Sequence, residues 1–494
     1  MITSSADEPT PARRGAKLYL VGIVVAQVCA LLRYWVLARL LGPQQLGLAA
    51  TLVLTASFFD LVTDMGGDRF LIQAKDGNDP SVQALVQFAQ LTRGIVVAVV
   101  LAALAWPLST LLKAPELFGA LAALAIPTLI GGFIHMDMRR FQRRHDFRAE
   151  GISLLVAEPL SVLATITVAI VLHSFSAIVY GLVARSLVIL IVSHLRSERP
   201  YSVAIERKHL GELTKFAGPL MVNGLLLFMG SQSDRVIVGG QLSLRELGIY
   251  SAIMLLIYYP STMVQRYMSA MYLPLVTAHR AASARRESVE LLGGQSILLA
   301  LLMSVGFAIA TPVFVPILYG AKFAQPAFTL ALIGVLQSSR FLLVLWPSTL
   351  ALGGGRSAVV LATNVVRLVA FPMAIVGAHI GGGLNAVVSA FALGEWAALG
   401  VGLFMTRSLS GGRLRDSLGR LCSFIFASML IGSWPLALAQ HGWAADVALA
   451  CASLIIAWWI LYRERAAILN VIDLLRAVVL RSPGAAGSVG QKAL

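Results

Sequence analysis

The chain of 494 residues is 58% hydrophobic and only 13% charged, and its mean hydropathy is +0.81. Soluble domains are about 45–50% apolar and about 25% charged, so this composition excludes a water-soluble globule and a disordered chain. The formal net charge of the chain is +15. In a membrane protein such an excess is explained by the Lys and Arg residues that accumulate in cytoplasmic loops. A nucleic-acid partner is therefore not expected.

Continuous apolar runs predict an all-α polytopic membrane protein, because about 20 apolar residues make one transmembrane helix. The polar segment 1–17 precedes a first run that is too long for a signal-peptide core, so we expect this run to be retained as a helix. About fourteen spans are predicted, at 18–41, 46–65, 84–112, 117–137, 151–172, 175–195, 214–240, 247–273, 289–318, 326–349, 358–379, 383–405, 420–439 and 444–462.

Charge gives an independent test of the topology. With the N-terminal segment inside and the spans alternating, the inside segments hold 28 of the 39 Lys and Arg residues and the outside loops hold 3. This asymmetry strongly favours cytoplasmic N- and C-termini. The predicted outside loops are short, so no extracellular domain is expected.

The order of the spans predicts two six-helix bundles, 18–196 and 214–405, joined by a cytoplasmic linker at 197–213. Two additional transmembrane helices occupy 406–462. The tail 463–494 begins with an apolar stripe between arginines, which predicts a helix lying on the membrane surface. It ends in a low-complexity sequence that we expect to be disordered.

A weak internal repeat relates the two predicted bundles. Arg33 in the first span is followed by a turn and a helix start at Leu46-Gly47, and Arg235 in the seventh span is followed in the same way by Leu247-Gly248. Chance similarity between two apolar stretches is the alternative. Transporters often consist of such repeated halves.

Motifs for catalysis are lacking. The sequence has no GxxxxGK[ST], GxSxG or HExxH motif, so a nucleotide-phosphate loop, a serine hydrolase and a zinc protease of those types are not indicated. The 8 histidines are scattered, and none of the 3 cysteines lies in a CxxC motif. We therefore predict no catalytic residue, no metal site and no cofactor.

Charged residues inside the predicted spans carry the functional information. Each costs about 2.5–3.5 kcal/mol at a helix centre on insertion scales, so those present usually face a bundle interior or a water-filled cavity. Seven of twelve are arginines, which suits an anionic passenger and especially phosphate. The twelve are Arg33, Asp60, Asp64, Arg93, Glu158, Arg185, Asp234, Arg235, Arg266, Arg340, Arg367 and Glu395.

Five arginines are predicted to line a cationic substrate cavity: Arg33, Arg235, Arg340, Arg367 and Arg266. Internal pairing, for example of Arg367 with Glu395, is the competing interpretation, and Arg266 is near enough to the inner surface to be an interfacial anchor.

Four acidic residues are candidates for ion or proton coupling: Asp60, Asp64, Asp234 and Glu395. Asp60 and Asp64 are spaced i, i+4, which places both on one helix face. Two close carboxylates in a low dielectric resist joint ionisation, so one of them tends to hold a proton. Pairing of either residue with an arginine of a neighbouring helix is the alternative.

Three segments together resemble the polysaccharide-export flippases, the O-antigen and exopolysaccharide branch of the multidrug/oligosaccharidyl-lipid/polysaccharide (MOP) exporter superfamily. Segment 37–73 carries the pattern LARLLGPxxxG followed by Asp64-Met-Gly66. Segment 216–254 carries Asp234-Arg235 and then Leu247-Gly248-Ile249-Tyr250, and segment 312–343 carries Tyr319-Gly320 and Phe323. The order and spacing of these loose motifs carry the resemblance, which covers most of 18–405.

The resemblance implies two six-helix bundles around a central cationic cavity. It also implies transfer of an undecaprenyl-pyrophosphate-linked oligosaccharide from the cytoplasmic to the periplasmic leaflet of a bacterial inner membrane. Membrane lipids and the lipid-linked oligosaccharide are the implied partners, and polymerase and chain-length proteins of the same pathway are candidate partners. Members of this branch usually have twelve helices, whereas the peptidoglycan-precursor branch has fourteen.

Other functions remain open from the sequence. A lipid II-type flippase and a MATE-like drug/cation antiporter share the superfamily, although an antiporter should have a cavity dominated by carboxylates. A glycosyl polymerase or ligase should carry a sizeable outside loop with catalytic residues, and no such loop is predicted. A purely structural membrane partner gives no reason for so many charges within the spans.

Overall fold

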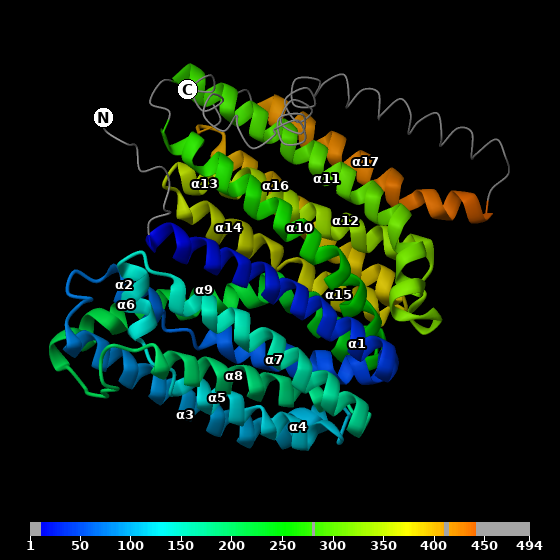
Figure 1. Ribbon diagram of the computed structural model, residues 1–494. Coiled ribbons are helices and arrows are strands. Elements are labelled where there is room, and N and C mark those ends of the chain that lie inside the picture. The colour runs from blue at the N-terminus through cyan, green and yellow to red at the C-terminus, as the bar shows by residue number, and fades with distance from the viewer. Residues whose placement is uncertain (1–10, 279–281, 410–413, 441–494) are drawn as a thin grey trace, which may run out of the picture. The chain divides into compact units, whose positions relative to one another are not determined.

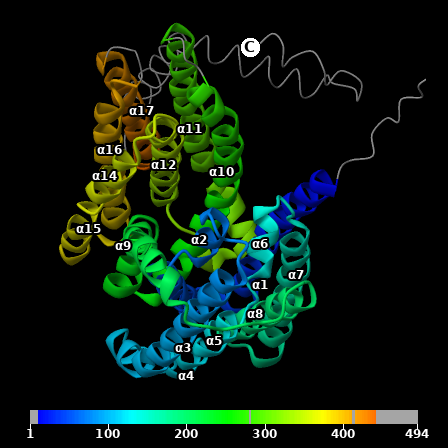
Figure 2. The same ribbon diagram turned by 90° about the vertical axis from the view of Figure 1, so that its left-hand side faces the viewer.

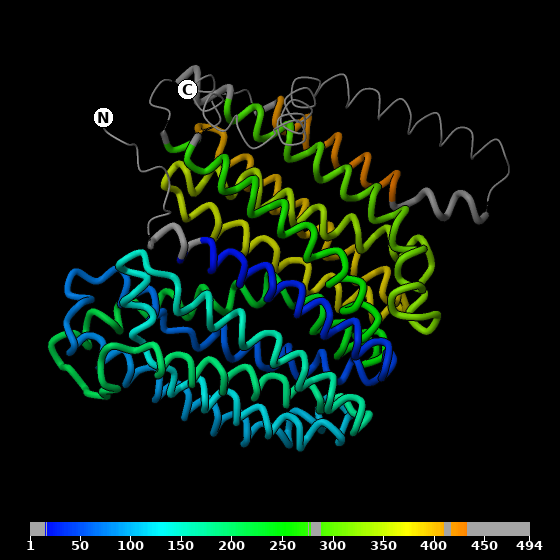
Figure 3. Tube along the Cα trace, in the orientation of Figure 1, coloured from blue at the N-terminus to red at the C-terminus, as the bar shows by residue number. Residues whose placement is uncertain are grey.

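The structure is a computed structural model that describes residues 11–278, 282–409 and 414–440 (Figures 1 and 3). The described residues form helices and no strands. Their α-helices are α1 (Pro11–Val62), α2 (Gly67–Gln73), α3 (Pro80–Leu111), α4 (Leu117–Ala123), α5 (Ala125–Gly132), α6 (Asp137–Arg143), α7 (Arg148–Leu172), α8 (Ala177–Leu195), α9 (Arg207–Ile237), α10 (Leu244–Ala278), α11 (Ala282–Tyr319), α12 (Ala327–Leu343), α13 (Thr349–Gly353), α14 (Ser357–Arg367), α15 (Ala370–His379), α16 (Gly383–Thr406) and α17 (Leu414–Gln440).

Three short elements interrupt these helices. Val238–Leu242 (η1) and Val344–Ser348 (η3) are single π-helical turns, and Ala321–Phe323 (η2) is a 3₁₀ turn. The π turn η3 contains Pro347, which removes a backbone donor from the helix and favours such a local change of winding.

Ten helical segments of the described residues are long and apolar enough to cross a membrane, or eleven if α4 to α6 are counted as one bent span. Large apolar side chains such as Leu195, Ile309 and Val99 are exposed on them, as expected for surfaces that face lipid. The predicted helix at 444–462 and the predicted surface helix and disordered tail at 463–494 lie outside the described residues. The count of fourteen therefore stays a prediction.

The first two predicted spans form one element, α1, that bends sharply. Gly42 has φ 77° and ψ 178°, a conformation that is essentially restricted to glycine. Pro43 follows and cannot donate a helical hydrogen bond. The Gly-Pro pair therefore separates the predicted spans 18–41 and 46–65, as their spacing in the sequence indicates.

The described residues divide into two compact units. Unit 1 comprises the described residues up to Tyr259 together with Val315–Ala324 and Ile375–Val387, and unit 2 comprises Pro260–Phe314, Gln325–Ala374 and the described residues from Val388 onward. The predicted bundle limits, 18–196 and 214–405, follow the order of the spans in the sequence, whereas these units are defined by which residues contact one another in space.

Unit 1 is a bundle in which helices distant in the sequence also lie side by side. Helix α1 packs against α7 and α9, α7 against α8, and α3 against α5 (Figures 1 and 2). The start of α3 is fixed by Asp79, whose carboxylate accepts the Ser81 backbone N–H at 2.9 Å. This hydrogen bond holds the pKa of Asp79 below its usual range, because it stabilises the charged form.

The two copies of the sequence repeat contact each other within unit 1. A Cβ atom added at Gly47 would clash with the Leu244 carbonyl oxygen, and one added at Gly248 would clash with the Pro43 carbonyl oxygen. Each glycine thus meets the carbonyl oxygen of the residue four positions before the other glycine. Such reciprocal contact is the geometry of two segments related by a local two-fold axis.

The core of unit 2 is apolar and built around aromatic side chains. Trp346, Phe341 and Phe424 are almost fully buried there and pack with leucines of α11, α12 and α16. Gly293 allows the close approach of Trp346, since a Cβ at this position would lie 3.0 Å from the indole ring. This packing fixes α12 and α16, which carry charged residues of the candidate site.

Candidate functional site

Three charged residues of unit 1 form a cluster around a buried glutamate. The Glu158 carboxylate on α7 accepts a hydrogen bond from Arg33 Nη2 at 3.1 Å and another from Arg185 Nε at 2.5 Å. Arg33 lies on α1 and Arg185 on α8, so the cluster joins three helices. One carboxylate serves two guanidinium groups, and the cluster carries an excess positive charge.

A second pair of charges lies near this cluster. Arg93 on α3 donates from Nε to Thr63 Oγ1 at 2.9 Å, and its Nη2 lies 3.4 Å from Asp60 Oδ1 on α1. Arg185 is within electrostatic reach of Asp60. The two groups of charges in unit 1 thus form one extended network, to which four helices contribute.

Asp64 does not share a helical face with Asp60, so this part of the sequence interpretation is wrong. Helix α1 ends at Val62, and Asp64 lies in the turn that follows. Its carboxylate accepts the Gly66 backbone N–H at 2.9 Å and lies 3.8 Å from Arg69 Nη2. Asp64-Met-Gly66 is an Asx turn, which competes with helical hydrogen bonding and ends the helix.

Asp234 and Arg235 on α9 differ in their surroundings although they are adjacent. Asp234 is buried and accepts the Tyr250 hydroxyl at 2.6 Å. Arg235 is half-buried, and its Nη1 contacts the Gln232 side-chain oxygen at 3.0 Å. Arg33 and Arg235 both lie within electrostatic reach of Tyr34 and Tyr259, so these two predicted site arginines belong to one region of unit 1.

Unit 2 contains a second cluster of two arginines and one glutamate. Glu395 on α16 accepts from Arg340 Nε on α12 at 3.2 Å and from Arg367 Nη2 on α14 at 2.6 Å, both through Oε1. All three residues were predicted as site residues, and the pairing of Arg367 with Glu395 was the competing interpretation. The structure brings the three together within unit 2.

Arg266, the remaining predicted cavity arginine, lies on the part of α10 that belongs to unit 2. Its side chain is exposed. No carboxylate among residues 11–278, 282–409 and 414–440 forms an ion pair with it, so it does not join the cluster around Glu395.

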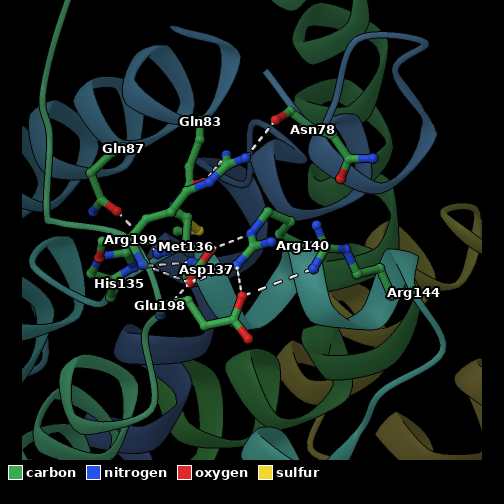
Figure 4. A network of polar contacts seen from close by, with 10 residues as sticks. All are labelled: Asn78, Gln83, Gln87, His135, Met136, Asp137, Arg140, Arg144, Glu198 and Arg199. Carbon is green, nitrogen blue, oxygen red and sulfur yellow. Dashed lines mark hydrogen bonds and ion pairs between the residues drawn. The ribbon is translucent and has the colours of Figure 1, made fainter. Parts of the chain in front are cut away.

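One end of unit 1 is held by a polar network that was not singled out from the sequence (Figure 4). Asp137 is fully buried and accepts from Arg140 Nε at 2.5 Å and from the Glu198 backbone N–H at 2.7 Å. Arg199 donates to Gln83 Oε1 at 2.9 Å and to the Asn78 carbonyl oxygen at 2.7 Å. The network ties α6 to the segments before α3 and after α8.

The arginines of segment 138–149 therefore do more than mark an inside loop. Besides the contact of Arg140, Arg139 pairs with Asp68 at 2.9 Å and Arg143 Nη1 donates to the Ile72 carbonyl oxygen at 2.9 Å. The i, i+3 spacing of Asp137 and Arg140 is the sequence signal that indicates such a pair.

Both clusters can attract an anion, and neither has the form of a catalytic centre. Each holds two guanidiniums against one buried carboxylate, and fixed charge acts strongly in such a low-dielectric surrounding. In the described part of the chain, His, Cys, Asp and Glu side chains do not gather in groups of three or more that could hold a metal ion. The arrangement is suited to binding and guiding a negatively charged group.

Residues 36–327 match the model of a family described as polysaccharide biosynthesis protein. The chain belongs to this family. Within the family, it is 25% identical over 355 residues to the succinoglycan biosynthesis transport protein ExoT of Rhizobium meliloti (strain 1021), which covers 71% of this chain and 70% of the relative. The family resemblance inferred from the sequence is thereby confirmed.

Solved structures support the fold of this family member. An inward-facing multidrug-resistance MATE transporter of the MOP superfamily is 12% identical with a TM-score of 0.58, covering 81% of this chain and 99% of that one. The lipid II flippase MurJ in an inward closed conformation is 10% identical with a TM-score of 0.58, covering 94% and 100%. The predicted all-α, MATE-like membrane fold is confirmed, and the named relatives are transporters rather than enzymes, as predicted for this chain.

Proposed function

We propose that this protein moves an undecaprenyl-pyrophosphate-linked oligosaccharide, the repeat unit of an exopolysaccharide or O-antigen, from the cytoplasmic to the periplasmic leaflet. Two findings support the proposal: membership of the polysaccharide biosynthesis family and similarity to a succinoglycan transport protein. The chemistry is transport of an amphiphile whose headgroup is anionic.

The observation that carries the proposal is the excess of positive charge at membrane depth. Each unit holds a cluster of two arginines and one glutamate, Arg33–Glu158–Arg185 in unit 1 and Arg340–Glu395–Arg367 in unit 2. A charge within the membrane is costly and is normally kept for function. A pyrophosphate headgroup is an anion that such excess guanidinium charge would stabilise.

In the proposed mechanism the arginines provide a positive potential along the path of the headgroup, while the polyprenyl tail stays in lipid. The two predicted bundles, 18–196 and 214–405, move so that this path opens first to one membrane face and then to the other. The contributing arginines are Arg33, Arg235, Arg340, Arg367 and Arg266.

Coupling to an ion or to the membrane potential would use carboxylates of the same region. Asp60 is the best placed of the four predicted residues, because its side chain is exposed, pairs with Arg93 and lies within electrostatic reach of Arg185. Asp64, Asp234 and Glu395 are each engaged in a hydrogen bond or ion pair, so they would have to exchange partners during the cycle.

The proposal includes a location and partners. We infer a bacterial inner membrane, where a lipid-linked polysaccharide precursor would cross. We also infer cytoplasmic N- and C-termini, because the predicted inside segments hold 28 of the 39 Lys and Arg residues. Polymerase and chain-length proteins of the polysaccharide pathway are the proposed protein partners, since they would receive the flipped precursor.

Reconstitution into vesicles tests the function directly. Vesicles are loaded with an undecaprenyl-pyrophosphate oligosaccharide, with lipid II or with an organic cation, and we expect translocation of the first donor. Single Ala variants of Arg33, Arg235 and Arg367 at equal protein level should reduce it by about tenfold or more, the worth of one charged hydrogen bond. If the protein translocates only lipid II or only the cation, the proposal is contradicted. Undiminished transport of the first donor by all three variants would also contradict it.

A further inference from the structure

The two arginine–glutamate clusters differ in how far their arginine side chains are exposed. In unit 2 both arginine side chains are largely covered, with 12% of Arg340 and 15% of Arg367 exposed. In unit 1, Arg33 is covered to a similar degree, at 10% exposed, but Arg185 is 39% exposed. Arg185 thus belongs to a cluster that has excess positive charge, and its guanidinium is also exposed.

The hydrogen-bonding pattern of the unit 1 cluster leaves donors for a ligand. Glu158 uses one oxygen for each arginine and contacts Arg185 only through Nε. Within the described part of the chain, Arg185 Nη1 and Nη2 donate no hydrogen bond to protein, and the buried Arg33 Nε also has no partner. A buried donor without a partner is costly, so a ligand or water is expected to complete the cluster.

A second ionisable side chain near Arg185 is also exposed. Asp60 lies within its electrostatic reach, is 71% exposed and pairs with Arg93. Asp60 lies on α1, Arg93 on α3 and Arg185 on α8, and Glu158 lies on α7. Ionisable groups at membrane depth that are exposed together face water rather than hydrocarbon, so we assign this region of unit 1 to a water-filled space.

We propose that Arg185 contacts a phosphate of the substrate headgroup through Nη1 and Nη2, and that Glu158 and Arg33 are the residues that position it. The planar guanidinium presents two parallel donors that match two phosphate oxygens. Glu158 fixes the Nε edge, which directs the Nη edge outward. The inference rests on the proposed function, and it names the contact residue of the same site.

The test measures binding of farnesyl pyrophosphate to the purified full-length protein, with farnesol as the uncharged comparison. R185A should bind farnesyl pyrophosphate about tenfold more weakly, as expected for the loss of a charged hydrogen bond, while farnesol binding stays unchanged. R185K keeps the charge but loses the paired donors, so its affinity should lie between those of R185A and wild type. R196A, a matched control at an exposed arginine just beyond the same helix, should bind like wild type.

Cysteine chemistry then tests water access and charge separately. In a background with Cys29, Cys422 and Cys451 replaced by serine, R185C should react with water-soluble methanethiosulfonates. The aminoethyl reagent, which restores a positive charge, should recover binding, and the sulfonatoethyl reagent should not. If R185C is unreactive, or if wild type and R185A bind the pyrophosphate equally, the assignment of Arg185 is overturned.

These outcomes are distinguishable from failure of the proposed function. If wild-type protein translocates the lipid-linked oligosaccharide and the Arg185 variants bind and translocate equally well, only the assignment of Arg185 fails. If wild-type protein neither binds the prenyl pyrophosphate nor translocates the donor, the proposed function itself fails.

Discussion

Single side chains show how this protein keeps charge inside a membrane. Glu158 and Glu395 each hold two guanidiniums from two other helices, so no arginine of either cluster is left without an opposite charge nearby. The glutamates are therefore as necessary for keeping these charges in the interior as the arginines are. Along the sequence, Glu158 precedes its α8 partner by 27 residues, whereas Glu395 follows its α14 partner by 28.

The substitution Glu395→Gln tests this role. It leaves two adjacent buried guanidiniums without a carboxylate, and breaking a buried ion pair in this way costs about 3–5 kcal/mol. We expect a clearly lower thermal unfolding temperature of the detergent-purified protein. Asp60→Asn is the control, because the exposed Asp60 side chain can be hydrated, and it should change the unfolding temperature little. An unchanged unfolding temperature for Glu395→Gln would show that the cluster is not the stabilising unit described above.

At the scale of elements, glycine decides how closely backbones approach. The reciprocal contact of Gly47 with Leu244 and of Gly248 with Pro43 leaves no room for a methyl group. Because the obstacle is backbone on both sides, no change of rotamer relieves it. The bend at Gly42-Pro43 presents the Leu46-Gly47 helix start for this contact.

Gly47→Ala and Gly248→Ala should each force the two segments apart. We expect faster hydrogen exchange in both segments, whichever of the two glycines is changed, together with a lower unfolding temperature. The double variant should cost little more than either single one, since neighbouring substitutions that break one contact are not additive. Gly240→Ala, at a nearby glycine with open space around it, is the matched control. If hydrogen exchange becomes faster only in the segment that carries the substitution, the prediction from the reciprocal contact is contradicted.

At the scale of the whole molecule, the distribution of Lys and Arg predicts which loops face which side of the membrane. The charge asymmetry predicts that segment 138–149 is inside and that the loop at Lys113 is outside. The polar network of Figure 4 gathers predicted inside segments and the span ends next to them, around Asn78, Asp137 and Arg199. This clustering is what the predicted topology requires of one end of unit 1.

Impermeant thiol labelling in intact cells tests that topology. Lys113→Cys and Arg144→Cys place cysteines at exposed side chains in the background without native cysteines. We expect labelling of the first and protection of the second until the membrane is permeabilised, because the reagent cannot cross the bilayer. Labelling of Arg144→Cys in intact cells would reverse the proposed orientation.

The sequence by itself determined the class of this protein. Apolar runs long enough to span a bilayer indicate a polytopic membrane protein, and the arginines within the spans indicate charge kept there for function, because bilayer thickness and the cost of buried charge act on any fold. It also identified the Leu-Gly repeat and all six charged residues of the two clusters as charges within spans.

Tertiary structure alone decided which charges meet. Glu158 lies 125 residues from Arg33, and only the packing of α1, α7 and α8 brings them into contact. The end of α1 at Val62 likewise separated Asp64 from the face of Asp60. Charge and hydropathy are properties of single positions, whereas pairing and exposure depend on neighbouring helices. For this reason only the structure showed that the Arg185 guanidinium is exposed.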